Sequence, residues 1–129
     1  MSDRRKLFDK LSVIAEAINR ERGPLTFCGL LHRTGAIDRW DFIVSADGLD
    51  GFTRGSLNYL VDLLRKTLTR RQFVSLSHME PRLKTDRLIK MLRSDDGIVP
   101  GKLSVPMDER YDRAYVLTAM KKRKPVKIY

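Results

Sequence analysis

Two strand-forming segments lie close together in the first half of the chain, and their spacing constrains the fold more than any other feature. Leu25–Arg33 is an apolar run bounded by Gly-Pro and Thr-Gly, and Trp40–Ala46 alternates in polarity along its length. A short segment containing "TGAID" joins them, and short turns of this kind connect neighbouring antiparallel strands. We therefore predict a β-hairpin. Within it, Asp41 falls on the face opposite to Trp40 and Phe42.

Helical periodicity precedes and follows this hairpin. Apolar residues recur every three or four positions from Asp3 to Arg22, which predicts an amphipathic helix that ends at Gly23-Pro24. We expect Gly23 to adopt the positive φ that is common at helix ends. A second such pattern runs from Leu57 to Leu68, with Asp50 or Thr53 as the candidate N-cap.

The second half of the chain carries shorter patterns. Thr69 and Gln72 have capping-box spacing, which predicts a short helix before a strand near Leu76 to Glu80. Pro81–Arg93 has the spacing of a third helix. The Gly- and Pro-containing segment that follows predicts a long loop with at most short edge strands, and Arg113–Met120 predicts a further strand.

This order of elements, α-β-β-α-(α)β-α-β, predicts the fold class. Adjacent strands followed by helices, without regular βαβ alternation, are typical of α+β proteins. We predict a two-layer α+β sandwich, with an antiparallel or mixed sheet and helices packed on one face. A ferredoxin-like arrangement is one of the topologies that this order allows. Residues 1–120 would form a single domain, and residues 121–129 a basic C-terminal tail.

The charge balance indicates the class of partner. The chain has 26 Lys and Arg against 16 Asp and Glu, a formal net charge of +10. Such a field attracts polyanions, because binding releases their counterions. Nucleic acid is therefore the leading partner, with RNA and DNA not distinguished. The alternative is an interaction subunit, which would bind an acidic protein in a larger assembly or form a homo-oligomer.

The sequence predicts neither a membrane-spanning segment nor a signal peptide. No apolar run approaches the roughly 20 residues that span a bilayer. The first residues lack the apolar stretch and small-residue cleavage site of a signal peptide. We therefore expect a cytoplasmic location and no membrane partner.

Basic residues gather in the second half of the chain. If they share one face, they form a surface for phosphate contacts, although solvated helix faces are the alternative reading. Few aromatic residues are interleaved with them, so stacking on bases is not predicted. The function predicted is binding without catalysis. The predicted nucleic-acid-binding residues are Arg82, Lys84, Arg87, Lys90 and Arg93 in the third helix and Lys121, Lys122, Arg123 and Lys124 in the tail.

Asp41 raises a second, enzymatic hypothesis. A strand-borne carboxylate with Asp38, Asp47 or Asp50 nearby would suit Mg²⁺, and a metal-dependent nuclease or phosphoryl-transfer enzyme would use it. The spacing matches neither an EF-hand nor a Walker motif, so we predict no metal and no cofactor and leave catalytic residues unassigned. In the favoured interpretation Asp47 and Asp50 cap the next helix, and Gly48, Gly51 and Gly55 permit turns.

Histidine and cysteine offer further candidates. His32 and His78 lie near predicted strand ends and form a candidate general acid–base pair, with structural or surface roles as the alternative. The His-x-Glu at His78 resembles part of the zinc-deaminase motif, but that chemistry also needs a Cys-x-x-Cys pair. The chain has a single cysteine, Cys28, which we expect to be a packed core thiol.

The segment from Phe27 to Glu80 resembles a group of small bacterial proteins. In their pattern a glycine-leucine strand precedes a "WDLVVSA"-type strand, here Trp40–Ala46, and a helix and an "ELLxLSRIVxL"-type segment follow. The resemblance implies an α+β domain of bacterial origin, with a short helix before the strand at Leu76. It implies no activity and no catalytic residue. Asp47-Gly48 stands here where the pattern has Pro-Trp.

Overall fold

The computed structural model describes residues 3–35, 37, 39–94, 98–106 and 108–119. The predicted basic tail, residues 121–129, lies outside these ranges. The predicted helices and strands are present within them, with shifted ends, of which the later start of the third helix is described below. In chain order the elements are α1 (Asp3–Arg22), β1 (Leu25–Arg33), β2 (Trp40–Ala46), α2 (Arg54–Thr67), α3 (Arg70–Ser75), β3 (Leu76–Pro81), α4 (Arg87–Ser94), β4 (Leu103–Ser104) and β5 (Tyr111–Ala119).

The strands form one mixed, five-stranded sheet in the order β3-β2-β1-β5-β4. The predicted hairpin is confirmed, since β1 pairs antiparallel with β2, and Leu31 stands opposite Asp41. Strand β3 runs parallel to β2 at the other edge of that pair and places His78 opposite Asp41. The ferredoxin-like alternative is not met, because no helix separates β1 from β2, as its β-α-β-β-α-β order requires.

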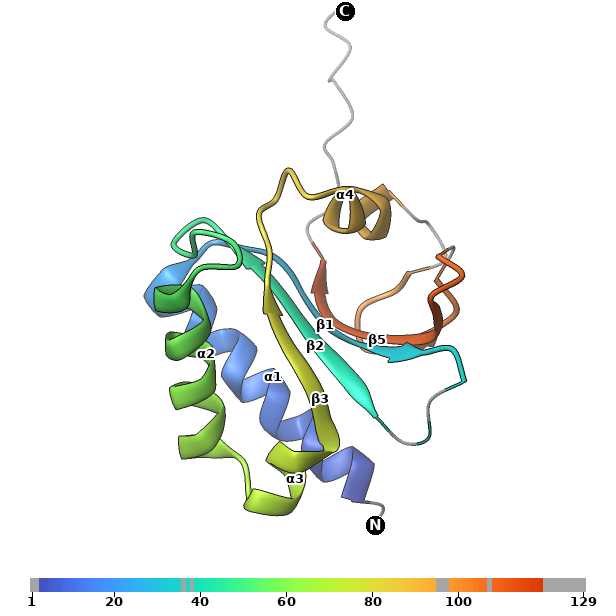
Figure 1. Ribbon diagram of the computed structural model, residues 1–129, viewed down its shortest axis with the longest axis horizontal. Coiled ribbons are helices and arrows are strands. Elements are labelled where there is room, and N and C mark those ends of the chain that lie inside the picture. Colours follow the sequence, from blue (N-terminus) through green and yellow to red (C-terminus); the bar gives the residue numbers. More distant parts are fainter. Residues whose placement is uncertain (1–2, 36, 38, 95–97, 107, 120–129) are drawn as a thin grey trace, which may run out of the picture.

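Helices α1 and α2 lie side by side against one face of the sheet (Figure 1). Leu30 of β1 and Phe42 of β2 are fully buried in the same apolar cluster as Leu11 of α1 and Leu64 of α2. Strand residues alternate between faces, so every second side chain reaches this layer. The predicted α+β sandwich, with helices packed on one face, is confirmed.

The short helix α4 covers part of the opposite face, which we call the α4 face. A second apolar cluster lies there, formed by the alternate residues of the same strands. Figure 1 shows α4 at the far end of the molecule from α3 and away from the α1 and α2 layer. The buried residues of this cluster include Phe27 of β1, Ile43 of β2 and Val116 of β5, with Leu88, Ile89 and Leu92 of α4.

Side-chain caps define the start of the two middle helices. Thr53 caps α2, since its side-chain oxygen accepts a hydrogen bond from the backbone N–H of Ser56. Asp50 is not the cap, because its own backbone N–H donates to the Ser56 hydroxyl at 2.9 Å. The predicted capping box of α3 is confirmed, with Thr69 and Gln72 bonded reciprocally.

Helix α4 begins at Arg87, later than the helical spacing predicted. The carboxylate of Asp86 accepts a hydrogen bond from the backbone N–H of Leu88 at 2.9 Å and so caps the helix start. Arg82 and Lys84, which we predicted to lie on this helix, therefore precede it. Their spacing relative to the basic residues of α4 is not that of one helical face.

Gly23 and Gly48 lie where backbone segments approach closely, and Gly48 is in the turn predicted for it. Positive φ occurs at Gly51, at 70°, but at neither Gly23 nor Gly48. A Cβ on Gly23 would lie 2.0 Å from the carbonyl oxygen of Asn19, and one on Gly48 would lie 2.5 Å from that of Arg22. The N–H of Gly48 donates to this same Arg22 oxygen at 2.6 Å, so the loop after β2 packs on the end of α1.

Candidate functional site

A buried carboxylate lies at the centre of the candidate site. The side chain of Asp41 has 0% of its surface exposed. Its Oδ2 atom accepts a hydrogen bond from Nε of Arg33 at 2.8 Å, and its Oδ1 atom lies 3.2 Å from Nδ1 of His78. Both partners are about half exposed, 51% for Arg33 and 54% for His78. One buried group therefore holds two side chains that reach solvent.

The register of the sheet brings these three residues together. His78 on β3 stands opposite Asp41 on β2, so the two side chains are neighbours on one face. Arg33 lies two residues beyond Leu31, which is the partner of Asp41 on β1, and so shares that face. The predicted orientation of Asp41, away from Trp40, is confirmed by this contact. We call Arg33, Asp41 and His78 the Asp41 cluster.

The contact with Asp41 fixes the imidazole of His78. An ionised carboxylate only accepts hydrogen bonds, so Nδ1 of His78 carries the proton that is donated. The other ring nitrogen, Nε2, forms no hydrogen bond with a described residue, and in the neutral ring it is the acceptor. An imidazole held through one nitrogen, with the second available, is the arrangement of a general base.

His32 lies on the other face of the sheet and has a structural environment. Its Nδ1 atom lies 2.7 Å from Oδ1 of Asp112, and its Nε2 atom accepts a hydrogen bond from Nη2 of Arg113 at 3.1 Å. Its ring packs edge-on against Trp40. The hypothesis of a His32 and His78 pair is wrong, because strand alternation places the two rings on opposite faces.

The His32 contact also affects Asp112. The hydrogen bond from His32 lowers the pKa of this carboxyl group below its ordinary value, and the charge of Arg113 lowers it further. Since both ring nitrogens of His32 are occupied and the residue is buried, no acid–base reaction with an external molecule is available to it. His32 ties β1 to β5.

Further charged groups surround the Asp41 cluster on the α4 face. Arg110 forms a two-pronged contact with Asp108, through Nη2 at 2.6 Å and Nε at 3.0 Å. This hydrogen bonding lowers the pKa of Asp108, and the nearby charge of Arg87 on α4 contributes. Burial raises the pKa of Tyr111, and the charges of Glu80 and Asp41 raise it further.

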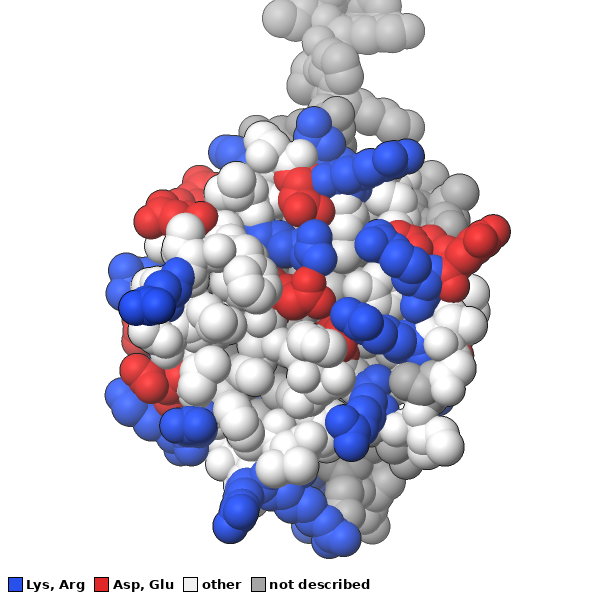
Figure 2. Space-filling view, in the orientation of Figure 1, with Lys and Arg blue, Asp and Glu red and all other residues white. Residues whose placement is uncertain are grey.

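The acids on this face lie deeper than their basic partners. The side chain of Asp108 is 17% exposed, whereas that of Arg110 is 65% exposed. The difference in exposure has the same sign for Asp41, which is fully buried, and Arg33, which is about half exposed. In Figure 2 acidic side chains near the middle of the view stand between basic ones, and basic side chains surround them. In both of these pairs an exposed arginine is therefore positioned by an acid that is more deeply buried.

Two of the predicted nucleic-acid contacts are engaged within the protein. Arg82 donates to Glu80 through Nη2 at 2.5 Å and to Asp86 through Nη1 at 3.1 Å. One oxygen of Glu80 and the Nε of Arg82 are buried without a hydrogen-bond partner among the described residues. Lys84 is exposed, and its Nζ atom lies 3.8 Å from Oδ1 of Asp47. Arg82 thus has its donors turned inward.

The predicted contacts on α4 are better placed. Arg87 and Lys90 are exposed, and Arg93 is partly buried. Lys121, Lys122, Arg123 and Lys124 lie outside the described residues. Sequence reasoning missed Arg33 and Arg110, which the fold adds to this face. The hairpin register held a signal for Arg33, because it places that residue diagonal to Asp41.

The acidic neighbours proposed for a metal site do not meet. Asp47 follows the far end of β2 and lies near Lys84, and Asp50 lies in the loop before α2. Asp38 is outside the described residues. Both oxygens of Asp41 contact basic side chains. No three His, Cys, Asp or Glu residues group as metal ligands within the described ranges.

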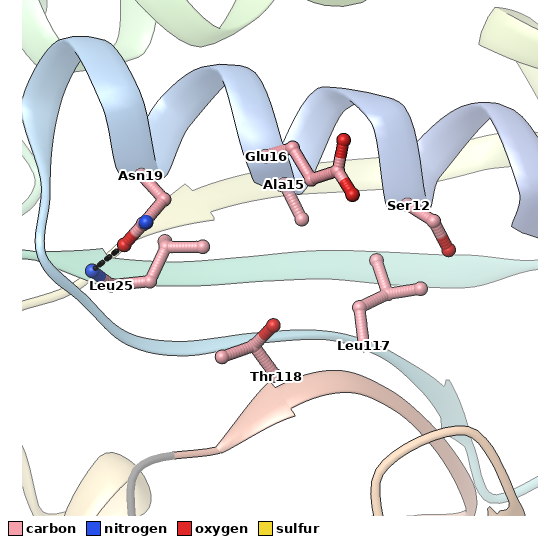
Figure 3. Close-up of a pocket in the computed structure, with 7 residues that line it drawn as sticks. All are labelled: Ser12, Ala15, Glu16, Asn19, Leu25, Leu117 and Thr118. Carbon is pink, nitrogen blue, oxygen red and sulfur yellow. Dashed lines mark hydrogen bonds between the residues drawn. The ribbon is translucent and has the colours of Figure 1, made fainter.

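A groove of about 420 Å³ lies between α1 and strands β1 and β5. Figure 3 shows Leu25, Ala15 and Leu117 between helix and strands, while Oδ1 of Asn19 accepts a hydrogen bond from the backbone N–H of Leu25. Among the described residues that line it, Glu16 alone is ionisable. The groove thus has a mixed polar and apolar lining without a pair of acid–base groups.

The structure also bears on the predictions for the cysteine and for membrane-spanning helices. Cys28 is a free, buried thiol in the cluster beneath α1 and α2, as predicted. Burial raises the pKa of this thiol, so it stays protonated and unreactive. Among the helices that the structure describes, none is long and apolar enough to cross a membrane.

Comparison with known proteins gives no family. No family model matches the chain, and neither a curated protein nor a solved structure is found to be similar to it. The resemblance to small bacterial proteins with a "WDLVVSA"-type strand stays an expectation from the sequence pattern.

Proposed function

We propose that the protein binds nucleic acid through contacts between phosphates and the basic side chains of the α4 face. The observation that carries the proposal is the depth of the charges on this face. Arginines are exposed at the surface, while the acids that hold them lie beneath. The exposed residues assigned to this surface are Arg33, Arg87, Lys90 and Arg110.

Pairing with an acid does not remove these arginines as phosphate ligands. A carboxylate that is shielded from solvent orients the guanidinium, while the donors on the other side of the group still face outward. The formal net charge of +10 adds a long-range attraction for polyanions. An arginine that is already oriented loses less side-chain freedom when it binds a phosphate. Both effects favour contact with a phosphate backbone.

The same face is poorly suited to reading bases. Tyr111, which lies next to Arg110, is buried in the second apolar cluster and is not available for stacking. The guanidinium of Arg110 instead lies over its ring, 5.7 Å from the centroid. Contacts to phosphate without contacts to bases give binding with little sequence preference.

A triple variant tests this function. We expect Arg87→Gln, Lys90→Gln and Arg110→Gln together to weaken binding of single-stranded RNA and duplex DNA. Each phosphate-binding cation contributes roughly 0.7 to 0.9 to the slope of log affinity against log salt, so removing three of these cations lowers that slope by about 2 to 3. Fluorescence anisotropy of labelled oligonucleotides between low and physiological salt measures it.

A matched control has the same net charge. Arg20→Gln, Arg54→Gln and Lys66→Gln remove three exposed cations from α1 and α2, on the other side of the sheet. This variant should keep the wild-type salt slope and most of the affinity. Equal weakening of binding in both triple variants would mean that net charge alone attracts the nucleic acid. Absence of binding by the wild type at low salt would overturn the proposal.

A further inference from the structure

The Asp41 cluster has more hydrogen bonds than a structural ion pair needs. Arg33 alone would neutralise the buried carboxylate of Asp41. The second carboxylate oxygen of Asp41, Oδ1, instead contacts His78. The ring of His78 is half exposed, and its Nε2 atom has no partner among the described residues. The Nη atoms of Arg33 likewise form no hydrogen bond with a described residue. The imidazole of His78, a base, and the guanidinium of Arg33, a cation, are therefore both held by the buried carboxylate of Asp41.

Neighbouring residues supply no nucleophile of their own. No hydroxyl or thiol among the described residues hydrogen-bonds to His78, and Cys28 is buried on the other face. The nucleophile must then come from the substrate or from water. RNA carries a 2′-hydroxyl beside each phosphate, whereas DNA does not. A general base next to a phosphate-binding cation suits that internal nucleophile.

We propose that the Asp41 cluster cleaves RNA, with His78 as general base and Arg33 as the ligand of the phosphate. The proposal rests on the nucleic-acid binding proposed above and names RNA as the substrate class. His78 and Arg33 are then the catalytic residues. Asp41 is a positioning residue, because it acts through both of them.

The reaction is an internal transesterification. Nε2 of His78 takes the proton of the 2′-hydroxyl, and the 2′-oxygen forms a bond to phosphorus as the bond from phosphorus to the 5′-oxygen breaks. The proton then passes from Nε2 to the departing 5′-oxygen. Arg33 stabilises negative charge on the phosphoryl oxygens, and Asp41 stabilises the imidazolium through Nδ1. The products are a 2′,3′-cyclic phosphate and a 5′-hydroxyl.

The test uses a labelled DNA strand with a single ribose at its centre, incubated with the full chain in EDTA. We expect cleavage at the ribose, with a 2′,3′-cyclic phosphate end detected by mass spectrometry, and no cleavage of the all-DNA strand. His78→Gln should lower the rate at least about 100-fold, as loss of a general base does. His78 is half exposed, so this variant should fold.

Two controls separate this inference from the proposed function. Lys66→Gln, on α2, should cleave at the wild-type rate, and His78→Gln should bind the same strand within about threefold of the wild-type affinity. Binding without cleavage, or cleavage by His78→Gln at the wild-type rate, would overturn the inference and leave the binding function standing. A wild-type chain that neither binds nor cleaves the strand would overturn both.

Discussion

Replacing Arg33 by leucine is expected to lower the free energy of unfolding by about 3 kcal/mol. The cost arises at Asp41, whose carboxylate is fully buried and would keep a single donor, His78, after the change. Removing one partner of a buried ion pair costs roughly 3 to 5 kcal/mol, because the charge that remains is uncompensated. The donor that remains places the expected value at the lower end. Urea unfolding, followed through the fluorescence of the single tryptophan, Trp40, measures it.

Replacing Asp41 by leucine should lower the free energy of unfolding less than Arg33→Leu does. Asp41→Leu leaves Arg33 and His78 without a partner, but both are half exposed and water can solvate them. The double variant, Arg33→Leu with Asp41→Leu, should regain most of the stability lost in Arg33→Leu, since replacing both members of a buried pair by apolar groups is often close to neutral. A double variant as unstable as Arg33→Leu would contradict this account. So would an effect of Arg33→Leu below about 0.5 kcal/mol, the size of an ordinary surface change.

Local signals in the sequence were sufficient for most of the secondary structure. The capping box at Thr69 and Gln72 is satisfied within four residues, so its sequence pattern predicts its geometry. The short connection between β1 and β2 likewise determines their antiparallel pairing. The start of α4 was predicted too early, because the apolar positions that indicate this helix, Leu88, Ile89 and Leu92, all follow the capping residue Asp86.

The meeting of His78 with Asp41 could not be predicted from local patterns. It depends on the parallel register between β2 and β3, and two helices separate these strands in the chain. Such a register is set by how the helices pack and not by a turn. By contrast, alternation along β1 places His32 on the face of Leu30, opposite to Arg33, and the sequence carried that information.

How deeply each charged side chain is buried also cannot be predicted from the composition. The sequence counts Arg82 and Arg110 equally as basic residues. In the fold, Arg82 is turned inward between Glu80 and Asp86, whereas Arg110 stands outside Asp108. A count of charges therefore leads only to a hypothesis about the class of partner, and the packing shows which cations are exposed to solvent.

Gly48→Ala is expected to lower the free energy of unfolding by about 3 kcal/mol. The new Cβ would lie 2.5 Å from the carbonyl oxygen and 2.8 Å from the Cα of Arg22, which are backbone atoms that cannot rotate away. Relieving such overpacking costs roughly 1 to 3 kcal/mol, and more where the backbone must move. The movement would also break the hydrogen bond from Gly48 to Arg22, which holds the loop after β2 against the end of α1.

A matched glycine lies seven residues away in the sequence. Gly55 is in the first turn of α2, has no atom within 4 Å of a built Cβ and does not have positive φ. Gly55→Ala should therefore raise stability by about 0.5 to 1 kcal/mol, because alanine restricts the unfolded chain and favours helix. Thermal unfolding of both variants gives the comparison. If Gly48→Ala is as stable as Gly55→Ala, then Gly48 serves only as a flexible turn and the close approach to Arg22 is not required.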